Sequence, residues 1–118
     1  MTISRQWLGR YGEDRACEYL VGQGYQILDR NWRLVDGELD IVCSKDKTLV
    51  FVEVKTRTSL AAGSPLEAIT RVKLAKLRRL AAGWCSQRQV SNTQVRFDAI
   101  GVLVNGGRVT IEHLRQVL

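Results

Sequence analysis

The stretch from Gly37 to Arg57 constrains the fold of this chain more than any other. Residues 48–56 alternate as a strand does, and the apolar run L-V-F-V at residues 49–52 indicates that this strand is buried on both faces. Side chains two positions apart in a strand share a face, so Glu53 and Lys55 leave the same face at its C-terminal end. An acid and a base beside a hydrophobic core need a structural or functional reason.

A second strand is expected just before this one, over residues 38–43, with a turn at residues 44–47 between them. A connection this short makes the two strands antiparallel neighbours, which brings Asp40 close to the acid and the base described above. Glu38 shares a face with Asp40, so either carboxylate could act with that pair. We favour Asp40.

The rest of the chain predicts two helices and three further strands. The helices are expected over residues 4–22 and 64–84, and the strands over residues 25–34, 94–104 and 108–114. Ser64, Pro65 and Glu67 have the spacing of a capping box that starts the second helix. A long helix after the third strand can cross over and return the next strand to the same sheet. We therefore expect one α/β domain over residues 1–118, with a mixed sheet of about five strands flanked by helices.

Two charged residues do not fit the apolar stripes of their predicted helices. Glu13 lies at the edge of the stripe of the first helix, and Lys73 lies in the middle of the stripe of the second. In one interpretation both are structural: the acid reaches solvent or pairs with an arginine, and the lysine extends past the edge of the sheet. In the other, both face the acids and the base at the strand end. The sequence leaves the two interpretations open.

The composition indicates a globular protein with a polyanionic partner. The formal net charge is +6, with 18 Lys and Arg against 12 Asp and Glu, and a cluster of acids inside a basic chain suits a metal site that acts on phosphodiesters. No apolar run reaches the roughly 18–20 residues that a membrane-spanning helix needs, and residues 1–7 lack the apolar core of a signal peptide. We expect a cytoplasmic protein with no membrane partner. We interpret its cysteines as reduced thiols at apolar positions; they are Cys17, Cys43 and Cys85.

The acids and the lysine have the chemistry that phosphodiester hydrolysis needs. One or two Mg²⁺ or Mn²⁺ ions held by carboxylates can activate water and neutralise the phosphate, and a lysine can orient that water. Asp40, Glu53 and Lys55 follow each other as D-x(12)-E-x-K. With Glu13 the acids could form a three-carboxylate pocket, to which the carbonyl of Val54 could add a further ligand. The candidate phosphate contacts are basic side chains, with Arg57 beyond the lysine as the strongest; the others are Arg30, Arg33 and Lys73.

Several motifs resemble those of a known family. D-x(12)-E-V-K on a strand hairpin resembles the PD-(D/E)xK nuclease superfamily. More closely, four segments are similar to the YraN family of bacterial proteins, and the resemblance covers nearly the whole chain. The segments are G-x-x-G-E-D-x-A-x-x-Y-L at Gly9–Leu20, R-N-W-R at Arg30–Arg33, G-E-L-D-I-V at Gly37–Val42 and F-V-E-V-K-T-R at Phe51–Arg57, with R-F-D at Arg96–Asp98 as a shorter match.

The resemblance implies a restriction-endonuclease-like fold, similar to archaeal Holliday junction resolvases, and a metal-dependent endonuclease that acts on DNA, including branched or junction structures. It implies metal ligation by Glu13, Asp40 and Glu53 and catalysis by Lys55. Leu39 stands where the superfamily's name has proline. Symmetric cutting of two strands needs two sites, so a homodimer suits this hypothesis. The alternative is a nucleic-acid-binding module with a nuclease-like fold that does not cut.

Overall fold

The computed structural model describes residues 4–61 and 63–118. The elements follow each other in the predicted order, with one short helix added. They are α1 (Arg5–Gly22), β1 (Gln26–Leu34), β2 (Gly37–Lys45), β3 (Thr48–Arg57), η1 (Pro65–Ala68), α2 (Arg71–Gln87), β4 (Gln94–Asn105) and β5 (Arg108–Leu114). Among these described residues, none of the helices combines the length and the apolar character that crossing a membrane requires.

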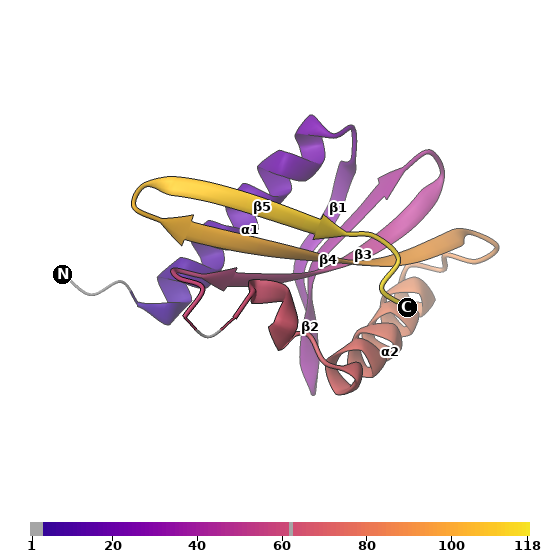
Figure 1. Cartoon of the computed structure of the whole chain (residues 1–118). Coiled ribbons are helices and arrows are strands. Elements are labelled where there is room, and N and C mark those ends of the chain that lie inside the picture. Colours follow the sequence, from indigo (N-terminus) through magenta and orange to yellow (C-terminus); the bar gives the residue numbers. More distant parts are fainter. Residues whose placement is uncertain (1–3, 62) are drawn as a thin grey trace.

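The five strands form one mixed sheet in the order β1-β2-β3-β4-β5. Neighbouring strands are antiparallel except β3 and β4, which run parallel because α2 crosses over between them. The sheet is strongly twisted, so β1 and β2 run steeply where β4 and β5 lie nearly horizontal (Figure 1). The predicted α/β class, with a restriction-endonuclease-like arrangement of sheet and helices, is confirmed.

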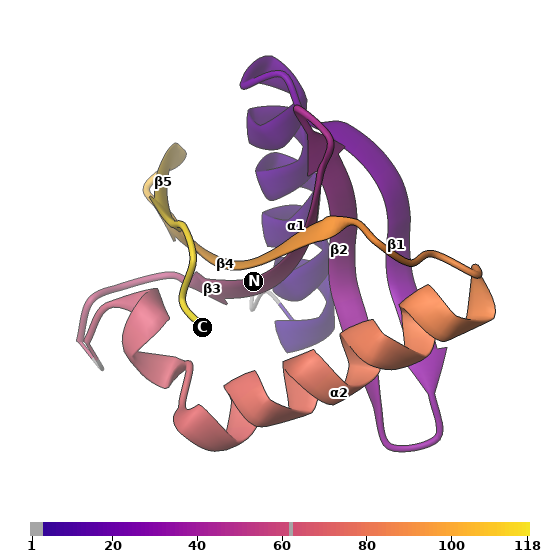
Figure 2. The same ribbon diagram turned by 90° about the vertical axis from the view of Figure 1, so that its right-hand side faces the viewer.

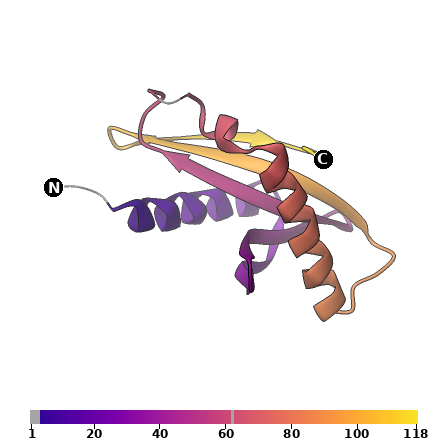
Figure 3. The same ribbon diagram turned by 90° about the horizontal axis from the view of Figure 1, so that it is seen from below.

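Both faces of β3 are buried, as the apolar run predicts. Val50 and Val52 belong to the cluster that packs under α1, whereas Leu49 and Phe51 belong to the cluster under α2. The helices therefore cover opposite faces of the sheet, and Figure 2 shows α2 passing beside the β1–β2 hairpin. The N-terminal end of α1 and the C-terminal end of β3 lie at the same end of the molecule (Figures 1 and 3).

The strands β2 and β3 part at one point. Their pairing ends with Ile41 opposite Val52, so Asp40 and the residues after Val52 lie just beyond the last pair. The alternation of β2 breaks at the same place, because Leu39 packs in the cluster under α2 while Ile41 packs in the cluster under α1. This irregularity opens a gap between two otherwise regular strands.

The single helix predicted over residues 64–84 is wrong. Ser64 does form the predicted capping box with Glu67, but it caps only the short 3₁₀ helix η1. Ile69 is extended (φ −92°, ψ 107°), and Thr70 then caps a separate helix by accepting a hydrogen bond from the Lys73 amide. A β-branched pair favours such a break, because both residues lose side-chain freedom in a helix.

The turn between β2 and β3 is also shorter than predicted. It holds two residues, Asp46 and Lys47, instead of the four at residues 44–47. Both have a positive φ (50° and 67°), which matches the twist of a tight hairpin. The predicted antiparallel pairing of the two strands is confirmed.

Candidate active site

An acid pair occupies the gap where β2 and β3 part. The Asp40 carboxylate accepts a hydrogen bond from the Val54 amide at 2.8 Å, and it lies within hydrogen-bonding reach of the Glu53 carboxyl group. Burial raises the pKa of Asp40 above its usual range, although the bond from Val54 opposes this rise. Burial, followed by the charge of Asp40, raises the pKa of Glu53 more strongly. Two half-buried carboxyl groups this close together cannot both ionise without cost.

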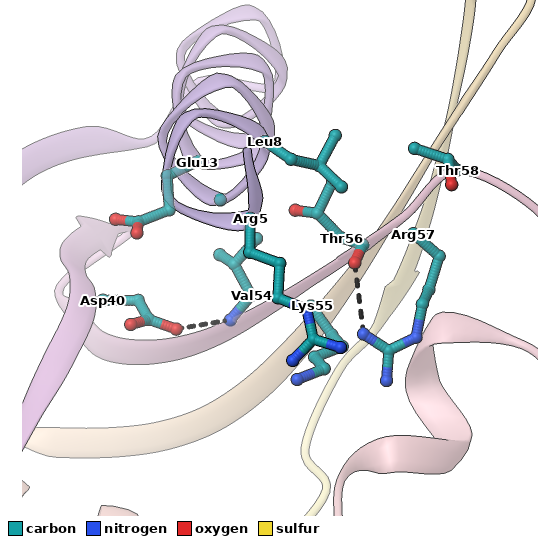
Figure 4. Close-up of a pocket in the computed structure, with 10 residues that line it drawn as sticks. Arg5, Leu8, Glu13, Asp40, Val54, Lys55, Thr56, Arg57 and Thr58 are labelled. Atoms are coloured by element: carbon teal, nitrogen blue, oxygen red, sulfur yellow. Dashed lines mark hydrogen bonds between the residues drawn. The ribbon is translucent and has the colours of Figure 1, made fainter. Parts of the chain in front are cut away.

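A third acid reaches this pair from α1. Gly12 packs against β3 so closely that a Cβ atom there would lie 1.9 Å from the Thr56 hydroxyl, which brings the adjacent Glu13 beside Asp40. Figure 4 shows the Glu13 carboxylate above that of Asp40. Burial, and then the charge of Asp40, raises the pKa of Glu13 from its usual 4.5 to about 7. Its Oε1 atom is buried and has no hydrogen-bond partner among the residues that the structure describes.

Three cations face the acids across a pocket of about 680 Å³. Lys55 and Arg57 come from the end of β3, and Arg5 comes from the first turn of α1; their charged groups gather on one side of the pocket (Figure 4). Burial lowers the pKa of Lys55, and the charges of Arg57 and Lys73 lower it further. The sequence analysis missed Arg5, because an exposed arginine at a helix start has no distinguishing pattern.

A second pocket, of about 330 Å³, lies on the other side of Asp40. Glu38, Asp40 and Glu53 line it together with Lys73 and Lys76 of α2. Lys73 lies on the same face of α2 as Leu77 and Leu80, as predicted, but it is exposed. Its charge acts on Glu53. Asp40 is the one side chain that lines both pockets.

Two predicted phosphate contacts are occupied elsewhere. Arg30 pairs with Asp14 at 2.7 Å, and Arg33 pairs with Glu38 at 2.9 Å. Neither arginine lines the pockets beside Asp40. The structure thus brings together the D-x(12)-E-x-K residues, Glu13, Val54, Arg57 and Lys73, and leaves Arg30 and Arg33 outside.

The donor chemistry of the acids fits Mg²⁺ or Mn²⁺. In the described part of the chain no group of three or more His, Cys, Asp or Glu side chains is arranged to hold a metal ion. The acids nevertheless offer hard oxygen ligands of the type these ions prefer, and the buried Glu13 Oε1 has no other partner among the described residues. The N–H and C=O of a strand residue point to the same side, so the Val54 carbonyl faces the gap as its amide does. An ion would be held by Asp40, Glu53 and this carbonyl, with Glu13 beside them.

Asp98 on β4 is a different, fully buried acid, and its carboxylate has the side-chain hydrogen-bond donors that the acid pair lacks. Arg96 donates to both of its oxygens at 2.8 and 2.7 Å, His113 lies 2.7 Å away, and the Gln116 amide donates at 3.0 Å. Tyr19 in turn contacts His113 at 2.9 Å. Burial alone would raise the pKa of Asp98, but these hydrogen bonds outweigh it and hold the pKa at about 2. This network gives Asp98 a structural role.

The mixed sheet, its two covering helices and the acid–lysine strand end define a restriction-endonuclease-like α/β domain. A family profile described as "Uncharacterised protein family UPF0102" matches residues 12–102. The UPF0102 protein of Beutenbergia cavernae is 51% identical over 111 residues, which cover 93% of this chain and 94% of that protein. Those of Paenarthrobacter aurescens (48% over 115 residues, 97% and 95% of the two chains) and Rhodococcus opacus (43% over 109 residues, 92% of each) are also similar.

The chain therefore belongs to the UPF0102 family, and the resemblance to the YraN family is confirmed.

Proposed function

We propose that this protein is a metal-dependent endonuclease that hydrolyses phosphodiesters of DNA. The observation that carries the proposal is the acid pair in the gap between β2 and β3, with Lys55 beside it. Three carboxyl groups with raised pKa values lie close together, and among the described residues none of them is in an ion pair with a Lys or Arg, so a divalent cation would supply positive charge in direct contact with them. The fold supports the proposal by analogy only, because one fold serves many functions.

The residues take separate roles in this proposal. Asp40, Glu53 and the Val54 carbonyl would hold one Mg²⁺ or Mn²⁺ ion, with Glu13 available to a second or to its water. When bound, the ion supplies a water of lowered pKa and charge to neutralise the phosphate. Lys55, whose pKa burial already lowers, orients that water or contacts a phosphate oxygen.

The cations at the pocket rim would bind the DNA backbone. Arg57 and Arg5 point into the same pocket as Lys55 (Figure 4), so their guanidinium groups can contact the phosphates next to the one that is cut. A net charge of +6 favours the approach of any polyanion. Binding by such contacts weakens steeply as salt rises.

Cleavage assays with Mg²⁺ or Mn²⁺ on linear duplex, single-stranded and four-way DNA test the proposal. Glu53→Gln and Lys55→Ala should each lower the cleavage rate at least about 100-fold, the scale on which positioned catalytic groups act. Glu18→Gln is the matched control, because Glu18 is exposed on α1 and pairs only with Arg15. A Glu53→Gln variant that cuts as fast as the parent protein would disprove the assignment of the site.

A non-cutting DNA-binding module is the second candidate, because Arg5, Lys55 and Arg57 line one pocket and could bind phosphates without a metal. Calorimetry separates the two candidates. Binding of Mg²⁺ or Mn²⁺ that disappears in Asp40→Asn supports the nuclease. Absence of binding at millimolar metal, with DNA still bound, supports the module.

A further inference from the structure

The pocket between the β1–β2 hairpin and α2 is a second groove, in which two lysines lie beside the acids Glu38, Asp40 and Glu53. Asp40 and Glu53 form its floor, and Lys73 and Lys76 reach it from the first two turns of α2. It joins the larger pocket only through Asp40, which lines both. The two pockets therefore lie on either side of the carboxylate at the centre of the proposed active site.

The two lysines of this groove do not form ion pairs with the described acids beside them. Among the residues that the structure describes, neither Lys73 nor Lys76 lies within ion-pair distance of a carboxylate, although Glu38 pairs with Arg33 at 2.9 Å. Lys73 acts on Glu53 only at longer range, where it opposes the rise of the pKa. Two extended lysines without a partner leave charge that a phosphate can neutralise.

One of these lysines, Lys76, occupies the space that Gly37 leaves open because it has no side chain. The Lys76 side chain lies across Gly37, so closely that a Cβ atom on Gly37 would be 2.5 Å from its Cε and 3.1 Å from its Nζ. The hairpin end is held against α2 by an ion pair between Asp36 and Arg79, and Figure 2 shows the two elements side by side. The Lys76 ammonium group can therefore lie at this point only because residue 37 is a glycine.

We propose that this groove is a second phosphate-binding subsite, in which Lys73 and Lys76 each contact one backbone phosphate of the bound DNA strand. The inference rests on the proposed function, because the cut phosphate is taken to lie at Asp40. The strand then continues from the pocket of Lys55 and Arg57, past Asp40, into the groove of Lys73 and Lys76. Glu38 pairs with Arg33, and Asp40 and Glu53 would be neutralised by the metal that they would hold, which would leave the lysines free to attract phosphate.

Salt-dependent binding of a short fluorescein-labelled single-stranded DNA tests the subsite, with Ca²⁺ in place of Mg²⁺ to slow cleavage. The double variant Lys73→Ala/Lys76→Ala should bind about tenfold more weakly at ~0.1 M salt. Its plot of log K against log salt should be shallower by about 1.4, because each phosphate contact on single strands contributes about 0.7. Lys47→Asn is the control: it removes one exposed lysine at the far hairpin turn and suits the positive φ there, so its plot should match the parent's.

Gly37→Ala tests the geometry without removing a charge. Its methyl group displaces the flexible end of Lys76 and lies 3.2 Å from the Leu80 Cδ1 atom, which can shift slightly. Gly37 does not have a positive φ, so the fold should persist, as a thermal unfolding curve can verify. We expect the plot to be shallower by about 0.7, as for Lys76→Ala alone.

The outcomes separate this inference from the proposed function. A parent protein that cuts DNA, with a salt dependence that none of these variants changes, disproves the subsite and leaves the nuclease standing. Shallower plots in a protein that never cuts support the groove and disprove the nuclease. A parent protein that binds no DNA disproves both.

Discussion

The sheet carries one fully buried acid, Asp98, and a half-buried acid pair, Asp40 and Glu53, and the two sites differ in how many hydrogen-bond donors contact them. Asp98 is fully buried, yet Arg96, His113 and the Gln116 amide all contact it. Asp40 has one backbone donor and lies against another carboxyl group, Glu53. The pKa of Asp98 is accordingly held at about 2, whereas the pKa values of the acids at the strand gap are raised.

The difference shows what each group contributes to the molecule. A buried carboxylate with a full set of donors fixes the structure around it, here the C-terminal residues after β5. A buried carboxylate next to another one costs stability, and a protein keeps such an arrangement where something else supplies the missing positive charge. The comparison makes the strand gap the place to look for a ligand, and Asp98 the place to look for stability.

The largest expected effect is on the satisfied acid. Asp98→Asn removes the charge that Arg96 and His113 contact, so it should lower the free energy of unfolding by about 3–5 kcal/mol, the usual result of breaking a buried pair. Urea denaturation measures this loss. Asp46→Asn, in the exposed turn between β2 and β3, is the control and should change it by less than about 0.5 kcal/mol. A loss for Asp98→Asn as small as that of the control would remove the contrast between the two groups.

An Asp→Asn substitution in the acid pair should raise the free energy of unfolding, not lower it. In the metal-free protein Asp40→Asn keeps an oxygen for the Val54 amide and gains a donor toward Glu53, so the unfolding free energy should rise by about 1 kcal/mol. Thermal unfolding with and without Mg²⁺ measures both this gain and the loss of any stabilisation by the metal. If the metal-free Asp40→Asn variant is less stable than the metal-free parent protein, our description of the acid pair is contradicted.

The smallest expected effect is on the pH dependence of stability. The pKa of Glu13 is raised from 4.5 to about 7, so its contribution to stability is fully present below pH 4.5 and is lost as the pH rises through 7. Asp98, with its pKa lowered from 3.8 to about 2, contributes above pH 3.8 and loses that contribution only toward pH 2.

Unfolding free energies at pH 5 and pH 8 measure the Glu13 effect without involving Asp98. The metal-free parent should lose about 1 kcal/mol more between these pH values than Glu13→Gln, a figure reduced from the full pKa shift because Glu13 is only partly buried. Equal losses in the two proteins would mean that Glu13 ionises normally and does not belong with the acid pair.

The acid pair could be predicted from the sequence because its geometry is local. An alternating strand, a short turn and a second strand bring Asp40 opposite Glu53 whatever the rest of the chain does. The Asp98 network could not be predicted in the same way. His113 and Gln116 come from the C-terminal end of the chain and Tyr19 from α1, and only the packed fold brings the first two to Asp98 and the tyrosine to His113.

The errors have similar causes. The apolar period continued across residues 64–84, but the local geometry at Ile69 and Thr70 divided that segment into two helices. Lys76 had no signal in the sequence, because its position depends on a hairpin end that is distant in the chain. The break in alternation at Leu39 was equally hidden, since a strand irregularity depends on what both faces pack against.

The parallel pairing of β3 with β4 bears on the order in which the molecule folds. Thr48 pairs with Gln94 and Arg57 with Leu103, so β3 obtains its second neighbour only after a long loop has closed. Pairings this distant in sequence slow folding, whereas the β1–β2–β3 meander can form from nearby residues. We therefore expect the strand that carries Glu53 and Lys55 to be half exposed until the C-terminal part of the chain docks, which makes completion of the acid site a late event in folding.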